Sequence, residues 1–518
     1  MRNGAIFSGG TMKKRSCNLL LAILVIVTIT TGGLCAAPAT EILTILHVND
    51  YHGRVNPSID KTIDADNPVG GAAYLAAMIK RERTRNPGGT VLLAAGDMFQ
   101  GSPVSNLAYG APVMHIMNEL KFDAMALGNH EFDWGVGVLE RLRREAHFPF
   151  LAANIVDPHG NLLPGMKRYV ILRKGQTKVA VIGVTTPETR YTTKPDNVKN
   201  LTFLSPENVL PGLINDVKQR GATIIIVLSH LGLDADKKVA STVPGIDAIV
   251  GGHSHTVIHK PLKTENGTVI LQTGAYGVYL GVLELIVDKA TSKAVGYTEA
   301  SGLKVVSAGA HDASDRRAAL IAKKYNDRVK DKFSAVVGTA SADLTTTRAG
   351  ESNLGNLVAD AMRAAAGCQI AFENSGGIRA NIPAGKITME EVFTAFPFDN
   401  VLISMTLTGE QVRTALEQGG TGDFGVMQVS GIAVTYDLKR PAGQRVVKAE
   451  VNGKPLDATA SYTVVTNDFL AAGGDKMAAL TQGKNIAYGD TLLDALVEYL
   501  KKHSPVSPQV EGRISFAQ

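Results

Sequence analysis

Short polar motifs that directly follow apolar runs constrain this chain more than any other feature of its sequence. The apolar runs are short and rich in branched aliphatic residues, which predicts buried strands. They span residues 42–48, 91–95, 124–127, 179–184, 224–228 and 248–250. Amphipathic stretches at 72–85 and 206–220 lie between them and predict helices. Strands that alternate with helices indicate an α/β architecture, whose sites form at the carboxyl ends of the strands.

The motifs after these runs combine Asp, His or Asn with flanking glycine. Five of them are Asn49-Asp50-Tyr51-His52-Gly53, Gly96-Asp97-Met98-Phe99-Gln100-Gly101, Gly128-Asn129-His130-Glu131-Phe132-Asp133, Ser229-His230-Leu231-Gly232 and Gly251-Gly252-His253-Ser254-His255. Taken singly, each has a structural explanation, because a Gly-Asp pair is usually a turn. Together they hold five of the twelve histidines, so chance placement explains them poorly. We interpret the remaining histidines near strands as structural, namely His47, His115, His147 and His259.

The chemistry of these side chains points to metal ions. Oxygen and imidazole ligands without thiolates suit Zn, Mn, Co or Fe, and they argue against a structural zinc site. Asp50 and His52 are two residues apart and can converge if the chain bends at Gly53. Seven potential ligands exceed what one catalytic ion needs, so two ions are implied, with Asp97 as the natural bridge. Two ions about 3.5–4 Å apart can hold a hydroxide and stabilise an in-line displacement at phosphorus.

The order of the motifs resembles that of the calcineurin-like metallophosphoesterases. Later segments, among them Asn374-Ser375-Gly376-Gly377-Ile378-Arg379, narrow the resemblance to the 5'-nucleotidase family, which includes periplasmic UDP-sugar hydrolases and animal ecto-5'-nucleotidases. The resemblance covers nearly the whole chain after its N-terminal segment. It implies a layered α/β/β/α two-metal phosphoesterase domain, followed by a smaller α+β substrate-binding domain.

The resemblance also implies roles for the motif residues. One metal ion would be held by Asp50, His52, Asp97 and His255, and the other by Asp97, Asn129, His230 and His253. His130 would face the phosphoryl group as a catalytic residue, oriented by Asp133. The two divalent ions are expected to be Zn, Mn or Co. Some relatives carry Gln where His255 stands, which leaves the metal preference open.

For the substrate, the resemblance implies a set of residues in the C-terminal part. Arg348 and Arg379 match arginines that bind phosphate, and planar guanidinium donors suit its oxygens. Phe398 and Phe469 match two aromatics between which the family stacks a nucleobase. Asn374 and Asp475 match positions that bind the base or the ribose. Without the resemblance, both phenylalanines would be interpreted as core residues and Gly473-Gly474-Asp475 as a turn.

The N-terminus has the pattern of an export signal. Three basic residues at 13–15 precede an apolar stretch at 19–30 and then small residues, so we expect residues 1–39 to be a signal peptide with a possible misassigned start. Lipid attachment at Cys35 is not expected, because Gly32-Gly33-Leu34 fits that processing poorly. The predicted location is periplasmic or secreted, with no stable membrane span after processing.

Net charge argues against a polymeric partner. Residues 1–39 hold four basic and no acidic residues, so the formal charge of the remainder falls from +5 to +1. A nearly neutral protein has no electrostatic attraction for nucleic-acid polymers, so we expect a small nucleotide as the partner. The oligomeric state is left open by the sequence.

The chain divides into predicted regions beyond the signal segment. Residues 40–311 form the expected metallophosphoesterase domain and 334–518 the expected nucleotide-binding domain. The charged stretch at 312–333 has helical spacing and is expected to link them, although an ordinary solvated surface helix would look the same. In the second domain we expect a helix at 353–366 and strands at 432–436, 448–451 and 462–467.

The expected function is hydrolysis of nucleoside 5'-monophosphates, with nucleotide diphosphates or nucleotide sugars as further candidate substrates. A 2',3'-cyclic-nucleotide phosphodiesterase with 3'-nucleotidase activity would share the metal motifs. A thiosulfate-ester hydrolase is a more distant alternative, because it would not need paired aromatics. An inactive nucleotide-binding or adhesive surface protein is the alternative outside enzymes, and His130, Asp133 and the complete ligand set argue against it.

Overall fold

The computed structural model describes residues 39–309, 314–420 and 422–517. The predicted signal peptide, with Cys35, lies outside these residues except for Ala39. Within the described ranges, no helix combines the length and the apolar character that a membrane span requires.

Two sheets form the centre of the N-terminal part. The seven-stranded sheet has the order β14-β13-β1-β2-β3-β4, with β15 also paired to β13. Its strands are β1 (Thr40–Val48), β2 (Thr90–Ala95), β3 (Ala124–Ala126), β4 (Phe150–Leu151), β13 (Tyr279–Asp288), β14 (Lys293–Tyr297) and β15 (Gly302–Val305). The neighbours β1, β2 and β3 run parallel, so their carboxyl ends lie at one edge.

The six-stranded sheet has the order β11-β12-β10-β9-β7-β6. Its strands are β6 (Tyr169–Lys174), β7 (Thr177–Thr185), β9 (Ile224–His230), β10 (Ala248–Val250), β11 (Leu262–Lys263) and β12 (Val269–Leu271). Here β7, β9, β10 and β12 run parallel. All six predicted strands are therefore present, three in each sheet.

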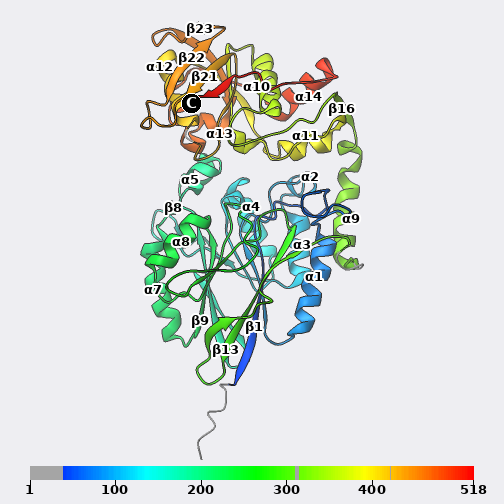
Figure 1. The fold of residues 1–518 in the computed structure, drawn as a ribbon, viewed down its shortest axis with the longest axis vertical. Helices are drawn as coiled ribbons and strands as arrows, with labels where there is room; N and C mark the ends of the chain where they lie inside the picture. The colour runs from blue at the N-terminus through cyan, green and yellow to red at the C-terminus, as the bar shows by residue number, and fades with distance from the viewer. Residues whose placement is uncertain (1–38, 310–313, 421, 518) are drawn as a thin grey trace, which may run out of the picture. The chain divides into compact units, whose positions relative to one another are not determined.

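The two sheets pack face to face and helices cover their outer faces. One buried cluster joins residues of both sheets, for example Ile45 and Leu93 with Val181 and Ile226. Helices α1 (Ala72–Arg85), α3 (Ala111–Leu120) and α4 (Gly135–Glu145) cover the seven-stranded sheet, and α7 (Pro206–Gln219) and α8 (Leu233–Thr242) cover the other. Figure 1 shows α7 and α8 on one side of the sheets and α1 and α3 on the other. The predicted α/β/β/α layering is confirmed.

The C-terminal part mixes helices with mainly antiparallel strands. A five-stranded sheet has the order β20-β17-β24-β19-β25, and a four-stranded sheet has the order β23-β22-β21-β26. Among these elements are β17 (Ile370–Glu373), β19 (Val401–Thr408), β21 (Ile432–Tyr436), β22 (Val446–Val451), β24 (Ser461–Asn467) and β25 (Lys484–Thr491). Helices α10 (Asn353–Ala366), α12 (Gly409–Gly419) and α14 (Leu492–His503) pack with them. This is the predicted α+β pattern, and α10 has the predicted bounds.

The helix expected to link two domains is α9 (Arg316–Phe333). It begins after Asp315, whose carboxylate accepts a hydrogen bond from the backbone of Ala318. Its apolar face, with Ala322 and Tyr325, packs into the same cluster as α1 and α3. Helix α9 is therefore half-buried rather than fully solvated, because this face packs on the helices that cover the seven-stranded sheet. The domain boundaries themselves stay a prediction.

Candidate active site

The motif residues meet at the carboxyl edge of the two sheets. Asp50 and His52 follow β1, Asp97 follows β2, and Asn129 with His130 follow β3. From the six-stranded sheet, His230 ends β9, and His253 with His255 follow β10. Five of these residues have a left-handed backbone, with φ between 48° and 77°. They are Asp50, His52, Asp97, His253 and His255.

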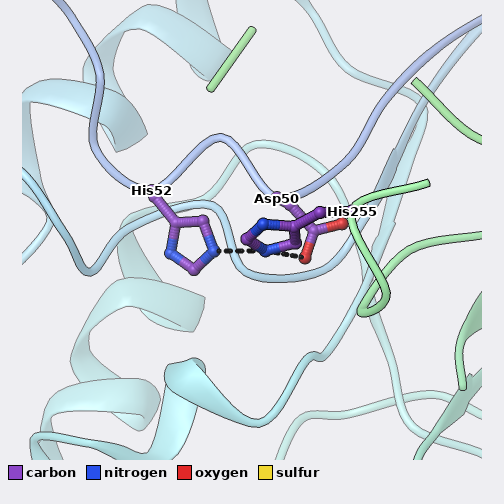
Figure 2. Close-up of side chains that lie close together, drawn as sticks. All are labelled: Asp50, His52 and His255. Atoms are coloured by element: carbon purple, nitrogen blue, oxygen red, sulfur yellow. Dashed lines mark hydrogen bonds and ion pairs between the residues drawn. The ribbon is translucent and has the colours of Figure 1, made fainter. Parts of the chain in front are cut away.

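The first group that can hold a metal ion is Asp50, His52 and His255 (Figure 2). The Nε2 atoms of the two histidines lie 3.2 Å apart, and Oδ1 of Asp50 is 3.3 Å from Nε2 of His255. Nδ1 of His52 donates to the carbonyl oxygen of Gln100 at 3.0 Å. Because that bond occupies Nδ1, the lone pair of His52 is on Nε2, where the three side chains converge.

The second group is Asp97, His230 and His253, with Asn129 beside it. Nε2 of His230 lies 3.0 Å from Oδ2 of Asp97 and 3.3 Å from Oδ1 of Asn129. Nδ1 of His230 donates to the carbonyl oxygen of Ala95 at 2.7 Å, so in the neutral ring, the form that binds a metal ion, Nε2 carries the lone pair. Nδ1 of His253 is 3.0 Å from the same Asn129 oxygen. Carboxylate, amide and imidazole atoms therefore converge as ligands of Zn, Mn or Co do.

Glycine is required at two positions because the motifs pack against one another's backbones. A Cβ on Gly128 would lie 2.2 Å from Oδ1 of Asp97. A Cβ on Gly252 would lie 2.5 Å from the carbonyl oxygen of Ala95 and 3.1 Å from Oδ2 of Asp50. Any larger residue at either position would push a candidate ligand out of its group.

Opposite charges stabilise one another in the second group. Burial opposes ionisation of Asp97, but the neighbouring His230 and His130 hold its pKa well below the usual range. Burial likewise opposes protonation of His230, yet the charge and hydrogen bond of Asp97 raise the pKa of His230 to about 10. Burial and the charge of His230 lower the pKa of His253 to about 3. The group thus has an anionic oxygen that attracts positive charge, which is the condition for cation binding.

Glu131 is a residue of this site for which the sequence suggested no role. Its carboxylate is buried and accepts three backbone N–H bonds, from Asp97 at 2.8 Å, Met98 at 2.8 Å and Gly128 at 2.7 Å. These bonds tie the loop after β2 to the loop after β3. They also support the left-handed backbone of Asp97. The Glu in the Gly-Asn-His-Glu segment was the only sequence signal for it.

His130 and Asp133 form the pair that the resemblance implied. Nδ1 of His130 lies 2.7 Å from Oδ2 of Asp133, and the hydroxyl of Thr193 donates to Oδ1 of Asp133 at 2.7 Å. The backbone N–H of His130 donates to Oδ1 of Asp97 at 2.9 Å. Burial opposes protonation of His130, but the Asp133 and Asp97 carboxylates raise its pKa above the ordinary value.

Three of the predicted substrate residues approach these groups. The guanidinium of Arg379 lies 3.4 Å from Nε2 of His52. The ring of Phe398 stacks against His130 with centroids 5.7 Å apart, and the preceding Pro397 accepts a hydrogen bond from Asn106 at 2.6 Å. Arg348 lies close enough to Arg379 and Asp475 for their charges to act on it, so it lies between this neighbourhood and the C-terminal residues below.

The other three lie together in the C-terminal part. Nδ2 of Asn374 donates to Oδ2 of Asp475 at 3.1 Å. Phe469 lies on α13 (Asp468–Ala471), where its ring packs against Gly474 and the adjoining core. Asp475 has a left-handed backbone, with φ 51°.

Comparisons with known proteins agree with this arrangement. Residues 43–257 match the family model described as calcineurin-like phosphoesterase, and residues 334–482 match the model of the 5'-nucleotidase C-terminal domain. The 5'-nucleotidase of Bos taurus is 32% identical over 92% of this chain and 91% of its own length. The chain belongs to the 5'-nucleotidase family. The predicted enzyme class, a metal-dependent phosphoric monoester hydrolase of the 5'-nucleotidase type, is confirmed.

Two further relatives of this family show the range of the similarity. The trifunctional nucleotide phosphoesterase protein YfkN of Bacillus subtilis is 33% identical over 91% of this chain, which corresponds to 35% of its own length. The crystal structure of a 5'-nucleotidase precursor from Thermus thermophilus has a TM-score of 0.86 and 34% identity. That likeness covers 92% of this chain and 99% of the other, so it includes both parts of the family's architecture.

Proposed function

We propose that this chain hydrolyses nucleoside 5'-monophosphates to a nucleoside and phosphate outside the cytoplasm. The observation that carries the proposal is the convergence of two metal-binding groups with the His130–Asp133 pair and the guanidinium of Arg379. Relatives over nearly the whole chain carry the name 5'-nucleotidase, which supports this choice of phosphate ester. The predicted signal peptide supports the extracytoplasmic location.

Each metal-binding group would hold one divalent ion. The first ion would be bound by Asp50, His52 and His255, and the second by Asn129, His230 and His253, with Asp97 shared by both. The donor set fits, because His52 and His230 each donate their other ring N–H to a backbone carbonyl and so offer a lone pair inward. When bound, the ions would polarise the phosphoryl oxygens and neutralise their charge.

The side chains around the phosphate would bind it and move a proton. Arg379 and Arg348 would bind phosphoryl oxygens, because forked guanidinium donors match their geometry. In hydrolysis, the water oxygen bonds to phosphorus while the bond to the 5' oxygen breaks, and the water loses a proton that later reprotonates His130. His130, kept protonated by Asp133 and Asp97, would donate a proton from Nε2 to that leaving oxygen.

The nucleoside would be bound by the remaining residues. Phe398 and Phe469 would stack on the base, and Asn374 and Asp475 would bind its polar edge or the ribose. Phe398 stacks on His130 in the structure, so a base bound by Phe398 would lie close to the proton donor. Nucleotide diphosphates and nucleotide sugars are included as candidate substrates. The name of the Bacillus subtilis relative, a trifunctional nucleotide phosphoesterase, supports testing several phosphate esters.

A substrate panel tests the proposal. AMP, UDP-glucose, 2',3'-cyclic AMP and bis-p-nitrophenyl phosphate are compared with and without chelator, and the chelated enzyme is reloaded with Zn, Mn or Co. We expect the highest kcat/KM for AMP, loss of activity on chelation and recovery with at least one ion. A preference for 2',3'-cyclic AMP would indicate a cyclic phosphodiesterase instead. Activity that resists complete metal removal would contradict the metal-dependent mechanism.

A further inference from the structure

A buried asparagine behind the predicted nucleoside site uses all its polar atoms within the protein. Asn467, at the end of β24, donates from Nδ2 to Oε2 of Glu373 at 2.9 Å and to Oδ1 of Asn374 at 3.0 Å. Its Oδ1 accepts from the backbone N–H of Leu470 at 2.8 Å, which caps α13. Neither Asn467 nor Glu373 belongs to the residues that the family resemblance implied.

Glu373 closes the rear of this network. Its side chain is 1% exposed, and a Cβ on Gly377 would lie 2.7 Å from its Oε1. The carboxyl group is therefore packed against the backbone of Gly377 while its Oε2 accepts from Asn467. Since Asn467 is 0% exposed, its amide is fixed by Glu373 on one side and by the α13 cap on the other.

The fixed amide of Asn467 determines how Asn374 is oriented. The carbonyl oxygen of Asn374 accepts from Asn467, and its Nδ2 donates to Oδ2 of Asp475 at 3.1 Å. If the Asn374 amide turned over, two NH₂ groups would meet at about the same 3.0 Å and its oxygen would face the Asp475 carboxylate. Both changes replace a hydrogen bond by a repulsive contact, so only one orientation is satisfied.

This orientation places the amide NH₂ of Asn374 on the side of Asp475 and its oxygen on the side of Asn467. A cavity of about 20 Å³, enough for roughly one water-sized group, adjoins the Asn374–Asp475 pair. It is lined by Phe424, Met427 and Met477 as well as that pair. Asn374 is half-buried, and one of its two amide N–H bonds is left after the bond to Asp475.

We propose that Asn467, supported by Glu373, is a positioning residue that makes Asn374 a hydrogen-bond donor to the substrate. The substrate class that such a site selects is a nucleotide whose base offers an acceptor, a ring nitrogen or a carbonyl oxygen, at that point. An exocyclic amine there would meet a second donor and be rejected. This inference rests on the proposed function, because it takes the Asn374 region as the nucleoside site.

The decisive variant is Asn467→Asp. Aspartate has the same size and still caps α13 through an oxygen, but it offers no N–H to Asn374 or Glu373. Asn374 then turns its NH₂ toward the new carboxylate at position 467, and its oxygen faces the ligand. We expect KM for AMP to rise about 10-fold with kcat within twofold, and KM for ribose 5-phosphate, which lacks a base, to stay unchanged.

One control accompanies this variant. Asn485→Asp makes the same chemical change at an exposed asparagine on β25 and should leave all constants unchanged. Asn467→Ser, which also caps helices, replaces Asn467→Asp if circular dichroism shows that the aspartate variant is unfolded.

Deaza analogues separate positioning from a merely structural role. We expect the wild type to discriminate about 5- to 10-fold against one of 1-deaza-, 3-deaza- and 7-deaza-AMP, the one lacking the acceptor that Asn374 contacts. Asn467→Asp should abolish that discrimination. Equal rises in KM for AMP and ribose 5-phosphate, or a wild type indifferent to all three analogues, would overturn the inference. A wild type without activity on AMP would refute the proposed function instead.

Discussion

The predicted metal ligands and the predicted substrate residues differ in how completely the protein buries their side chains. Five of the seven predicted metal ligands are almost completely buried, namely Asp50, His52, Asp97, Asn129 and His230. None of the six predicted substrate residues is buried: Arg348 is exposed, and the others are half-buried. Side chains that are already buried and hydrogen-bonded within the protein can bind an ion without rearrangement. The predicted substrate residues stay accessible to solvent, as they must for a molecule that enters and leaves.

Backbone conformation sharpens the contrast. Five of the seven predicted metal ligands have positive φ, a conformation that costs a non-glycine residue about 1 kcal/mol or more. Among the substrate residues only Asp475 does. Such conformations persist where the surroundings enforce them, and at Asp97 the three N–H bonds to Glu131 provide that enforcement. The predictions below test this difference, and they run from the largest expected effect to the smallest.

Asp97→Ala should have the largest effect, because Asp97 faces His230 and is the proposed shared ligand. We expect kcat/KM for AMP to fall about 1,000-fold or more and the metal content to fall by at least one ion per chain. Metal analysis and steady-state kinetics on the same preparation measure both. Asp157→Ala, in an exposed turn, makes the same substitution away from the site and should change neither. Full activity of the Asp97→Ala variant would contradict the two-metal mechanism.

His130→Asn should separate chemistry from metal binding. The substitution removes the proposed proton donor but no metal ligand, so we expect kcat to fall about 100- to 10,000-fold with unchanged metal content. Asp133→Asn should have a smaller effect in the same direction, because it lowers the pKa of His130 without removing the ring. Loss of bound metal in the His130→Asn variant would contradict this separation of proton donation from metal binding.

Phe469→Ala tests whether the half-buried residues act on the base. If the ring stacks on it, KM for AMP should rise about 10-fold, and KM for p-nitrophenyl phosphate should change far less. Phe516→Ala, at a half-exposed ring on β26 (Ile514–Phe516), serves as the matched control. Equal effects on both substrates would leave Phe469 with a packing role only.

The smallest effect concerns stability and pH. Burial raises the pKa of Glu373 from 4.5 to about 8, so between these values the folded chain binds more protons than the unfolded chain. The free energy of unfolding should therefore fall as pH rises through this range. Glu373→Gln removes this contribution, so its Tm should fall less steeply than that of the wild type between about pH 5 and 8 by calorimetry. Parallel Tm curves for the two proteins would contradict a neutral buried Glu373.

Much of the fold was predictable because local pattern and tertiary packing agree. The buried runs at 42–48 and 224–228 became β1 and β9, and the amphipathic stretch at 72–85 became α1 with the same bounds. The ten-residue strand β13 was not predicted, although it pairs with β1 along almost its full length. No polar motif follows β13, and nothing in its local sequence indicates which strand it will join.

The polar motifs by themselves determined which atoms are available to bind metal, since Asp, Asn and His without cysteine restrict the ion and the reaction class. Only the tertiary structure decided which ring nitrogen of each histidine is available to bind a metal ion. The carbonyl oxygens of Gln100 and Ala95 set the tautomers of His52 and His230, and Asn467 sets the amide of Asn374. These choices depend on hydrogen-bond partners that lie 48 to 135 residues away along the chain, and a motif does not contain its own partners.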